Sequence, residues 1–346
     1  MIEVLDTDAA LHALVPEWDA LWRCLPGRLP FAAPAWLLPW WRHFGTGQPR
    51  VATLRRDGRL AAVLALYVLD EPGGRKLLPI GAGLSDHQDL LAEPGVDPSP
   101  LLHAVLARDD GLAVCDLIEV PPESVLHGLA PPPGWDMRWD DGSPCPVLAL
   151  SAAGLTGAVP AGQLRKLRMN RHRAERGGGV VRERAAADTL PCLQAELIRL
   201  HQARWTGTGE AGVLADPAVL ALHLDAAPGL LLAGALRLEV LRVNGTVVAA
   251  IMALLMPGRI LFYLSGYDAA HGFISPGTLL LGAMLEDAAA EGRTEADFLR
   301  GREGYKYAWG AVDRLNATYS FRPVPCSERV ELRGKNLRMQ RGPHVD

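Results

Sequence analysis

The sequence has little of what marks secreted or metal-binding proteins. Its five cysteines are scattered through 346 residues and form no Cys-x-x-Cys pair, which argues against a disulfide framework and predicts a reduced, cytoplasmic environment. The first ten residues, MIEVLDTDAA, contain no basic segment and no apolar core, so a signal peptide is not expected. Cys/His ligand spacing is also missing from the sequence, and no metal site is expected.

The sequence also has no long uninterrupted apolar run and no excess of positive charge. Its most apolar region, Val247–Leu264, is broken by Pro257, Gly258 and Arg259, well inside the roughly 20 residues that a membrane span needs. This region therefore predicts a hairpin. The net charge of −4 and the pI of about 6.2 argue against nucleic acid as the main partner.

An internal repeat is the first positive feature. Asp57-Gly58 and Asn244-Gly245 each separate two apolar runs, which is the strongest short hairpin signal because type I′ turns need positive φ. A Ser-Pro pair followed by an apolar helix comes after each hairpin, at Ser99 and at Ser275. We predict two similar domains, residues 1–155 and 156–346, with chance similarity of two α/β units as the alternative.

The second repeat carries the pattern of a cofactor cleft. An apolar strand, Ile260–Tyr267, is followed by a loop and then by Ser275 and Pro276. Serine is a good N-cap and proline suits the first helical position. The helix ends at Gly292, and a strand, Ala296–Arg300, follows at once. A helix that begins after a strand can bind phosphate at its N-terminus, although most helix N-termini bind nothing.

These segments resemble the GNAT acyltransferase superfamily, and within it the cellulose-biosynthesis-type (CelD/BcsL-like) acetyltransferases, which are related to the Fem-type peptidyltransferases. The residues that carry the resemblance are Ser275-Pro276-Gly277, Asp297-Phe298-Leu299-Arg300-Gly301, Glu303, Tyr305-Lys306, Trp309-Gly310, Leu200-His201, Arg204-Trp205, Gly209-x-x-Gly212 and Ser85-Asp86-His87-Gln88-Asp89.

The resemblance implies an α/β fold made of a tandem pair of GNAT-like domains, each a mixed sheet flanked by helices. It implies transfer of an acyl group from acetyl-CoA or another acyl-CoA to an amine, or a hydroxyl, of a small molecule or glycan precursor. The C-terminal domain is expected to be catalytic, because the first repeat lacks a glycine after Ser-Pro and a Tyr-Lys pair. The expected cofactor-binding residues are Ser275, Pro276, Gly277, Thr278, Leu264 and Gly266.

Three residues after the helix are the expected catalytic groups: Asp297, Glu303 and Tyr305. An amine that attacks a thioester must lose a proton and the departing thiolate must gain one, so a carboxylate base and a tyrosine acid would suit. For Asp297, a structural role in a turn or ion pair is an equal alternative. The loop also departs from the usual GNAT pattern, since Pro276 removes one backbone donor.

The acceptor is expected to bind residues from both repeats. Those residues are His201, Arg204, Trp205, Tyr267, Arg300, Lys306, Asp86 and Asp89. The alternatives are structural: a helix docked over the sheet for His201 and Trp205, a solvated Lys306, and a turn closed by the two aspartates.

Three further questions stay open in the sequence. A basic helix, residues 165–176, predicts either a solvated face or a contact with an anion. Two other functions remain as alternatives, a Fem-type transferase that uses aminoacyl-tRNA and an inactive binding module. The sequence does not predict an oligomeric state.

Overall fold

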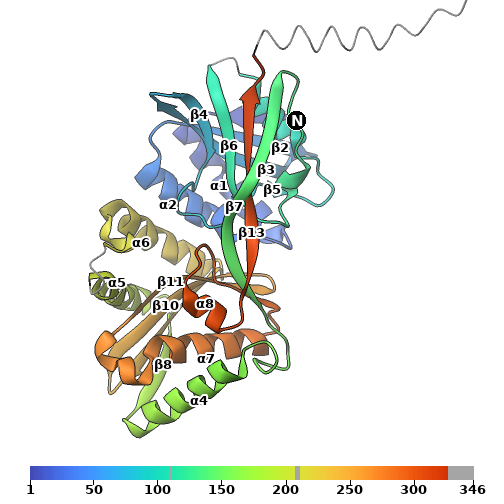
Figure 1. Cartoon of the computed structure of the whole chain (residues 1–346). Coiled ribbons are helices and arrows are strands. Elements are labelled where there is room, and N and C mark those ends of the chain that lie inside the picture. The colour runs from blue at the N-terminus through green and yellow to red at the C-terminus, as the bar shows by residue number, and fades with distance from the viewer. Residues whose placement is uncertain (109–110, 207–210, 326–346) are drawn as a thin grey trace, which may run out of the picture.

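The computed structural model describes residues 1–108, 111–206 and 211–325, and Gly209, Cys326 and the basic tail from Arg333 lie outside them. The described strands form one mixed sheet in the order β1-β2-β3-β4-β6-β13-β7-β12-β11-β10-β9-β8, with β5 paired to β3. Helices pack on both faces, so the expected α/β class is confirmed (Figure 1).

The first half of the chain contributes ten strands and helices and two short 3₁₀ turns. They are β1 (Ile2–Leu5), α1 (Asp8–Cys24), η1 (Pro30–Ala32), α2 (Pro34–Phe44), β2 (Gln48–Arg56), β3 (Arg59–Glu71), β4 (Gly74–Pro79), β5 (Leu91–Ala92), α3 (Ser99–Leu106), β6 (Leu112–Val120), η2 (Val125–Gly128) and β7 (Trp135–Ala149).

The second half follows a similar order, with an added helix before its first strand, no strand that corresponds to β5, and a helix before its last strand. Its elements are α4 (Ala161–Arg176), β8 (Val180–Arg184), α5 (Leu190–Thr206), η3 (Val213–Ala215), α6 (Pro217–Leu232), β9 (Leu236–Val243), β10 (Thr246–Met256), β11 (Arg259–Tyr267), η4 (Ala269–Ile274), α7 (Pro276–Ala290), β12 (Glu295–Asp297), α8 (Gly304–Ala308) and β13 (Val312–Pro323).

The strand order repeats between the halves. The series β2-β3-β4-β6 and the series β9-β10-β11-β12 both run antiparallel, antiparallel, then parallel. The predicted hairpins are confirmed: Asp57 and Asn244 both have φ of 50°, and the glycine after each also has positive φ. The apolar region Val247–Leu264 forms the hairpin β10–β11, as predicted.

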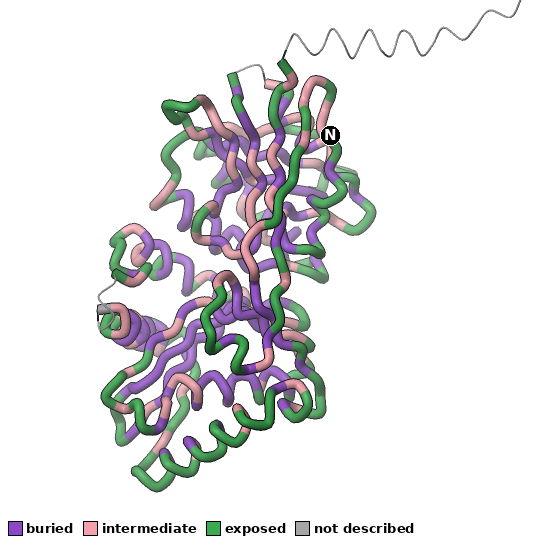
Figure 2. The backbone as a smooth tube through the Cα atoms, viewed as in Figure 1, coloured by how far each residue is buried: buried purple, intermediate pink, exposed green. Residues whose placement is uncertain are grey.

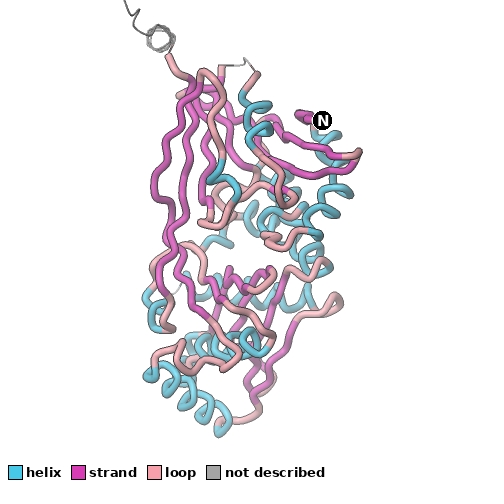
Figure 3. The backbone as a smooth tube through the Cα atoms, turned by 90° about the vertical axis from the view of Figure 1, so that its right-hand side faces the viewer, coloured by secondary structure: helices cyan, strands magenta, loops and turns pink. Residues whose placement is uncertain are grey.

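Two long strands connect the halves. β7 and β13 pair antiparallel along most of their lengths, from Val312 opposite Val147 to Pro323 opposite Trp135. One end of β7 pairs with β12 in the second half, whereas β13 pairs with β6 in the first half. Figure 3 shows this ribbon running along the molecule from one half to the other. The division into domains at 155/156 stays a prediction.

Most of the interior lies between sheet and helices in three clusters. One cluster lies under α3 in the first half, and a second lies under α4 and α7 in the second half. The largest joins α1 and α2 to α5 and α6, and so crosses between the halves. Figure 2 shows the buried backbone of both halves continuing through their junction.

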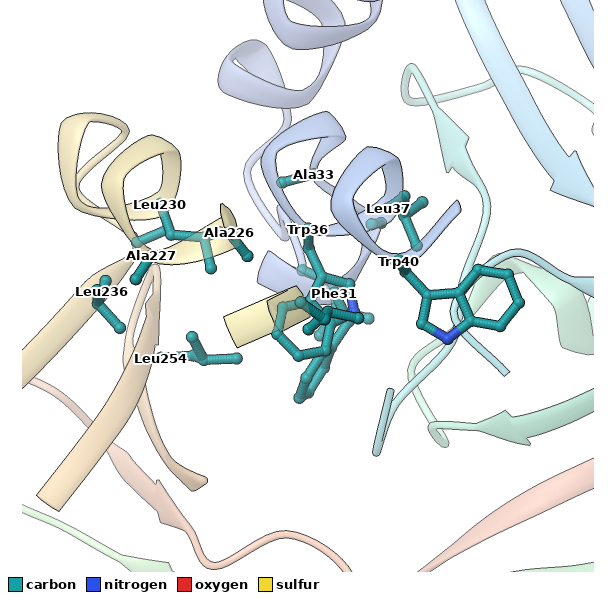
Figure 4. Close-up of a cluster of buried hydrophobic side chains, with 14 of the residues drawn as sticks. Phe31, Ala33, Trp36, Leu37, Trp40, Ala226, Ala227, Leu230, Leu236 and Leu254 are labelled. Carbon is teal, nitrogen blue, oxygen red and sulfur yellow. The ribbon is translucent and has the colours of Figure 1, made fainter. Parts of the chain in front are cut away.

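The tryptophans of α1 and α2 belong to this shared core, as the sequence predicts for packing residues. Trp18, Trp22, Trp36, Trp40 and Trp41 are all buried. Figure 4 shows Trp36 and Phe31 of the first half beside the apolar side chains of α6 and β10. None of the described helices is both long and apolar enough to cross a membrane.

Candidate active site

The site begins where two parallel strands separate. β11 and β12 pair only from Arg259 opposite Glu295 to Leu261 opposite Asp297. β12 then ends, while β11 continues to Tyr267. The pairing of β11 with β10 also shifts register at this point, which leaves Tyr263 as an extra residue. Such bulges bend a strand and are common beside active sites.

A pocket of about 520 Å³ lies in this gap. The volume is within the usual range of small-molecule sites, roughly 300–1,000 Å³. Five elements surround it: β11, α4, α5, α8 and the start of α7. Its lining residues are Gln163, Lys166, Arg204, Ile251, Phe262, Tyr263, Leu264, Ser265, Gly266, Tyr267, Gly272, Ser275, Pro276, Gly277, Thr278, Leu281, Phe298, Tyr305, Ala308 and Trp309.

The start of α7 forms one end of the pocket. Ser275 has φ of 50°, and its side chain does not cap the helix, so the expected serine cap is wrong. Its hydroxyl points instead to the carbonyl of Gly272, 3.5 Å away. Because the first N–H groups of a helix have no partner within it, those of Gly277 and Thr278 remain available to a ligand. Pro276 supplies none.

The equivalent position in the first half is closed. β4 and β6 pair only near their starts, and the cavity beyond has a volume of about 20 Å³, bordered by Gln88 and Asp89. That volume holds about one water molecule. At the start of α3 the Asp97 carboxylate accepts from the N–H of Ser99 at 2.9 Å, so a negative charge already occupies this helix N-terminus.

An aromatic and cationic cluster forms another wall, next to the start of α7, where Tyr267 lies beside Gly277. Arg204 of α5 stacks on the rings of Trp205 and Tyr267, with its guanidinium carbon 5.5 and 5.3 Å from their centroids. It also approaches Ser265 Oγ at 3.5 Å. Arg204 and Tyr267 line the pocket, and such stacking holds the planar cation in a fixed orientation.

Tyr305 of α8 lies on the same pocket and is the candidate proton donor with the best position. Its ring packs edge-on against Phe298, with 6.2 Å between centroids, and the residue is 43% exposed. Withdrawal of its hydroxyl from bulk water raises the pKa to about 12, and the Glu303 carboxylate adds to the shift. Tyr305 therefore remains protonated at neutral pH.

Glu303 and Lys306 pair with each other beside the turn after β12. The Lys306 ammonium is buried and donates to the carbonyls of Leu299, Arg300 and Gly301 at 2.7–3.1 Å. It also pairs with Glu303 at 2.9 Å. Lys306 is therefore used in holding the turn after β12, and neither residue is among those that line the pocket.

The carboxylates Asp297, Asp86 and Asp89 lie outside the pocket lining as well. Asp297 is buried and lies 2.9 Å from His87 Nε2. Asp86 pairs with Arg300 at 2.5 Å, and Asp89 accepts from Ser124 Oγ at 2.6 Å. Burial raises the pKa of Asp89 to about 7. Among the described lining residues no aspartate, glutamate or histidine occurs, so the expected carboxylate base has no support in this geometry.

His201 and Trp205 form the helix-docking arrangement. Trp205 Nε1 donates to His201 Nε2 at 3.1 Å, and His201 is buried. Burial, assisted by the Arg204 charge, lowers the pKa of His201 to about 4, so the ring is neutral. Of this pair and Arg204, only Arg204 lines the pocket.

The structure adds Gln163 of α4 to the lining residues that the sequence predicts. Lys166, also in α4, belongs to the basic segment for which the sequence leaves contact with an anion open. Tyr263, Phe298 and Trp309 read as ordinary core residues, since each is buried or nearly so. Only their position beside the separated strands makes them part of a pocket.

Comparisons with known proteins find similarity in the half that carries the pocket. Residues 161–307 match the family model described as an acetyltransferase (GNAT) domain. Comparison of the sequence with curated proteins finds no match.

Solved structures share the fold along almost the whole chain. The structure of FemX is 12% identical with a TM-score of 0.63, covering 92% of this chain and 97% of that one. The C-terminal domain of a putative lysylphosphatidylglycerol synthetase from Agrobacterium fabrum is 13% identical with a TM-score of 0.56, covering 94% and 96%. L-PGS from Bacillus licheniformis is 14% identical with a TM-score of 0.51, covering 89% and 98%.

At these identities the structural matches show a common fold, while the family model identifies the half that carries the pocket. Residues 161–307 therefore resemble an acetyltransferase (GNAT) domain.

Proposed function

We propose that the protein is an acyltransferase that moves an acyl group from an acyl-CoA to an amine in the pocket of its C-terminal half. The observation that carries the proposal is the uncapped start of α7 at one end of a 520 Å³ pocket, beside strands that separate. The N–H groups of Gly277 and Thr278 and the positive end of the helix dipole suit a pyrophosphate. A small amine or a glycan precursor is the proposed acceptor.

Acyl-CoA fits the residues that are present. The part of β11 beyond Leu261 has no β12 partner, so its backbone can bind the amide groups of an extended ligand arm. The apolar walls, Leu264, Phe298 and Leu281, suit a chain that carries few charges. When bound, the cofactor supplies an activated acyl thioester.

Tyr305 is the proposed acid. The amine nitrogen forms a bond to the acyl carbon while the carbon–sulfur bond breaks, and the sulfur takes a proton. With a pKa of about 12, Tyr305 holds its proton more tightly than a thiol of about 8.5. We therefore assign it hydrogen-bond donation to the developing thiolate, with the amine's released proton reaching the sulfur through it.

Isothermal calorimetry with acetyl-CoA tests the proposal directly. We expect wild-type protein to bind acetyl-CoA with a dissociation constant below about 1 mM, which corresponds to a binding free energy more favourable than about −4 kcal/mol. Dephospho-CoA and free pantetheine separate the contribution of the phosphates from that of the arm. Wild-type protein with no heat change at millimolar acetyl-CoA contradicts the proposal.

A second candidate is a Fem-type transfer from aminoacyl-tRNA, and one observation favours it. The exposed face of α4 has five cations with no ion pair among the described residues: Arg165, Lys166, Arg168, Arg173 and Arg176. Lys166 borders the pocket, so an extended polyanion could lie along α4 with its end in the pocket. Tight tRNA binding together with no acetyl-CoA binding would replace the first proposal by this one.

A further inference from the structure

A buried polar network joins the two halves directly behind the pocket. His87 comes from the loop after β4 in the first half, and Asp297 comes from the end of β12 in the second. His87 Nε2 lies 2.9 Å from Asp297 Oδ2, and His87 Nδ1 lies 3.2 Å from Asn316 Oδ1 in β13. All three side chains are nearly fully buried.

The hydrogen bonds of Asn316 fix which of its atoms faces His87. Its Nδ2 donates to the carbonyl of Asp86 at 2.9 Å and to Glu119 Oε2 at 2.8 Å. Reversal of the amide would place Asn316 Oδ1 against both of these acceptors. Asn316 Oδ1 is therefore the atom that faces His87, and it can only accept.

Both ring nitrogens of His87 consequently face acceptors. A neutral imidazole has one N–H, so it would direct a lone pair at either Asn316 Oδ1 or the Asp297 carboxylate. Burial alone would raise the pKa of Asp297, but the hydrogen bond and charge of His87 outweigh it, and the pKa is lowered. With Asp297 ionised, only an imidazolium donates to both acceptors.

The surrounding charges support this protonation state. Three carboxylates, Asp297, Asp86 and Glu119, lie in the network, and Arg300 is the cation that contacts it, pairing with Asp86 at 2.5 Å and Glu119 at 3.8 Å. Arg314 acts on Asp297 from farther away. A protonated His87 brings the buried charges closer to balance.

Asp297 in turn holds the segment that carries Tyr305. Its Oδ1 accepts from the N–H of Leu299 at 2.7 Å. Leu299 has φ of 58°, an unfavourable conformation for a bulky residue that persists only when its surroundings fix it. Lys306 Nζ binds the Leu299 carbonyl from the other side, and Tyr305 precedes Lys306.

We propose that His87 is a positioning residue: as a buried imidazolium paired with Asp297, it couples the first half to the strained 297–301 turn and so sets the place of Tyr305 in the pocket. The part of the inference that concerns turnover rests on the proposed acyltransferase function. The protonation state of His87 and the rigidity of the 297–301 turn do not depend on that function, and both can be measured without any ligand.

The protonation state is tested by ¹⁵N NMR of the histidine-labelled wild-type protein at pH 7.5. We expect both nitrogens of His87 to show the shifts of a protonated ring, with the signal assigned by its absence in His87→Gln. In Asp297→Asn, which keeps the shape of the side chain, the same ring should become neutral. A neutral His87 in the wild type overturns the inference.

Positioning is tested by hydrogen exchange. In His87→Gln, amide exchange in residues 298–306 should become at least roughly tenfold faster, which corresponds to a decrease of about 1.4 kcal/mol in the free energy of local opening. Asp297→Asn takes the place of this variant if His87→Gln does not fold. The matched control is His127→Gln, which removes a ring bonded to Tyr319 Oη and the Pro121 carbonyl in the same half. It should leave that segment unchanged.

Unchanged exchange in residues 298–306 of a folded His87 variant overturns the positioning role. If exchange rises while wild-type protein fails to bind acetyl-CoA, the inference stands and the proposed function fails. If wild-type protein binds acetyl-CoA and turns over, kcat should fall in His87→Gln with little change in acetyl-CoA affinity, because Gly277 and Thr278 lie on a different element.

Discussion

Gly266 of β11 faces the backbone of His201 in α5 so closely that no side chain fits between them. A Cβ at Gly266 would collide with the backbone nitrogen of His201 and with Leu200. The close approach brings α5, with Arg204, against the strand that forms the pocket floor. The missing side chain at Gly266 therefore determines the position of one wall of the site.

Gly266→Ala should destabilise the protein by about 2 kcal/mol or more, because overpacking against backbone forces α5 away from the sheet. Urea unfolding followed by tryptophan fluorescence measures the change. The control is Gly272→Ala, which also lines the pocket but has nothing within 4 Å of the added Cβ. Equal stability of the two variants would mean that α5 yields to the methyl group at little cost.

Gly277→Val should weaken acetyl-CoA binding at least roughly tenfold, about 1.4 kcal/mol. The added methyl groups would occupy the space in front of the free N–H groups at the start of α7. In Gly277→Ala the Cβ meets only the Tyr267 ring, at 3.5 Å, which is ordinary contact. Calorimetry on both variants separates obstruction from disruption of the fold. Unaltered affinity in the valine variant would place the phosphates elsewhere.

Tyr305→Phe should lower turnover by roughly 10²-fold, within the usual range for a proton donor. Acetyl-CoA affinity should stay within about twofold, because the ring still packs against Phe298. Steady-state kinetics and calorimetry give the two quantities. Glu303→Gln is the comparison: since Glu303 pairs with Lys306 and does not line the pocket, it should reduce turnover far less. A larger loss of turnover in Glu303→Gln than in Tyr305→Phe would indicate that the Glu303 carboxylate is the catalytic group.

The features that the sequence predicts well are those with a local cause. Asp57-Gly58 and Asn244-Gly245 form their hairpins because tight turns need positive φ. The start of α7 falls at Pro276, because proline suits the first helical turn. Leu264, Gly266 and residues 275–278 line one pocket because a strand and the helix after it are close in sequence and in space.

The features that it predicts poorly depend on distant partners. Lys306 reads as a solvated or substrate-binding cation, yet it binds carbonyls of a turn whose shape depends on Asp297. Asp297 contacts His87, which lies in a loop 210 positions earlier in the sequence. The same holds for β13, whose pairing with β6 follows from no pattern in either strand.

Two cations at different places on α4 distinguish the two candidate donors. Lys166 borders the pocket, whereas Arg176 ends the helix. If acyl-CoA is the donor, Lys166→Gln should weaken its binding roughly threefold to tenfold, about 0.7–1.4 kcal/mol, and Arg176→Gln should not. If aminoacyl-tRNA is the donor, both variants should weaken tRNA binding and reduce its dependence on salt. Fluorescence titrations at 50 and 200 mM salt would measure both.

A buried histidine should make the protein less stable in acid. His223 of α6 lies among Trp36 and Tyr263 at the junction of the halves, and neither of its ring nitrogens has a partner among the described residues. Burial, with a smaller effect from His201, lowers the pKa of His223 to about 4. In the unfolded chain the pKa of His223 is near 6.5, so the unfolded chain binds the proton more readily than the folded protein does.

Stability should accordingly fall as the pH decreases from about 6.5 to about 4, by roughly 3 kcal/mol for this one group. His223→Leu removes the titrating ring and should flatten that part of the profile, with a gain that grows from about pH 6.5 downward and levels off below about pH 4. Little change is expected at pH 7.5, where the ring is neutral in both states. Urea unfolding across the pH range measures the slope. His12→Leu, at an exposed position in α1, should leave the slope as it is. A His223→Leu profile as steep as the wild type would show that other groups, such as the neighbouring His201, account for the acid sensitivity.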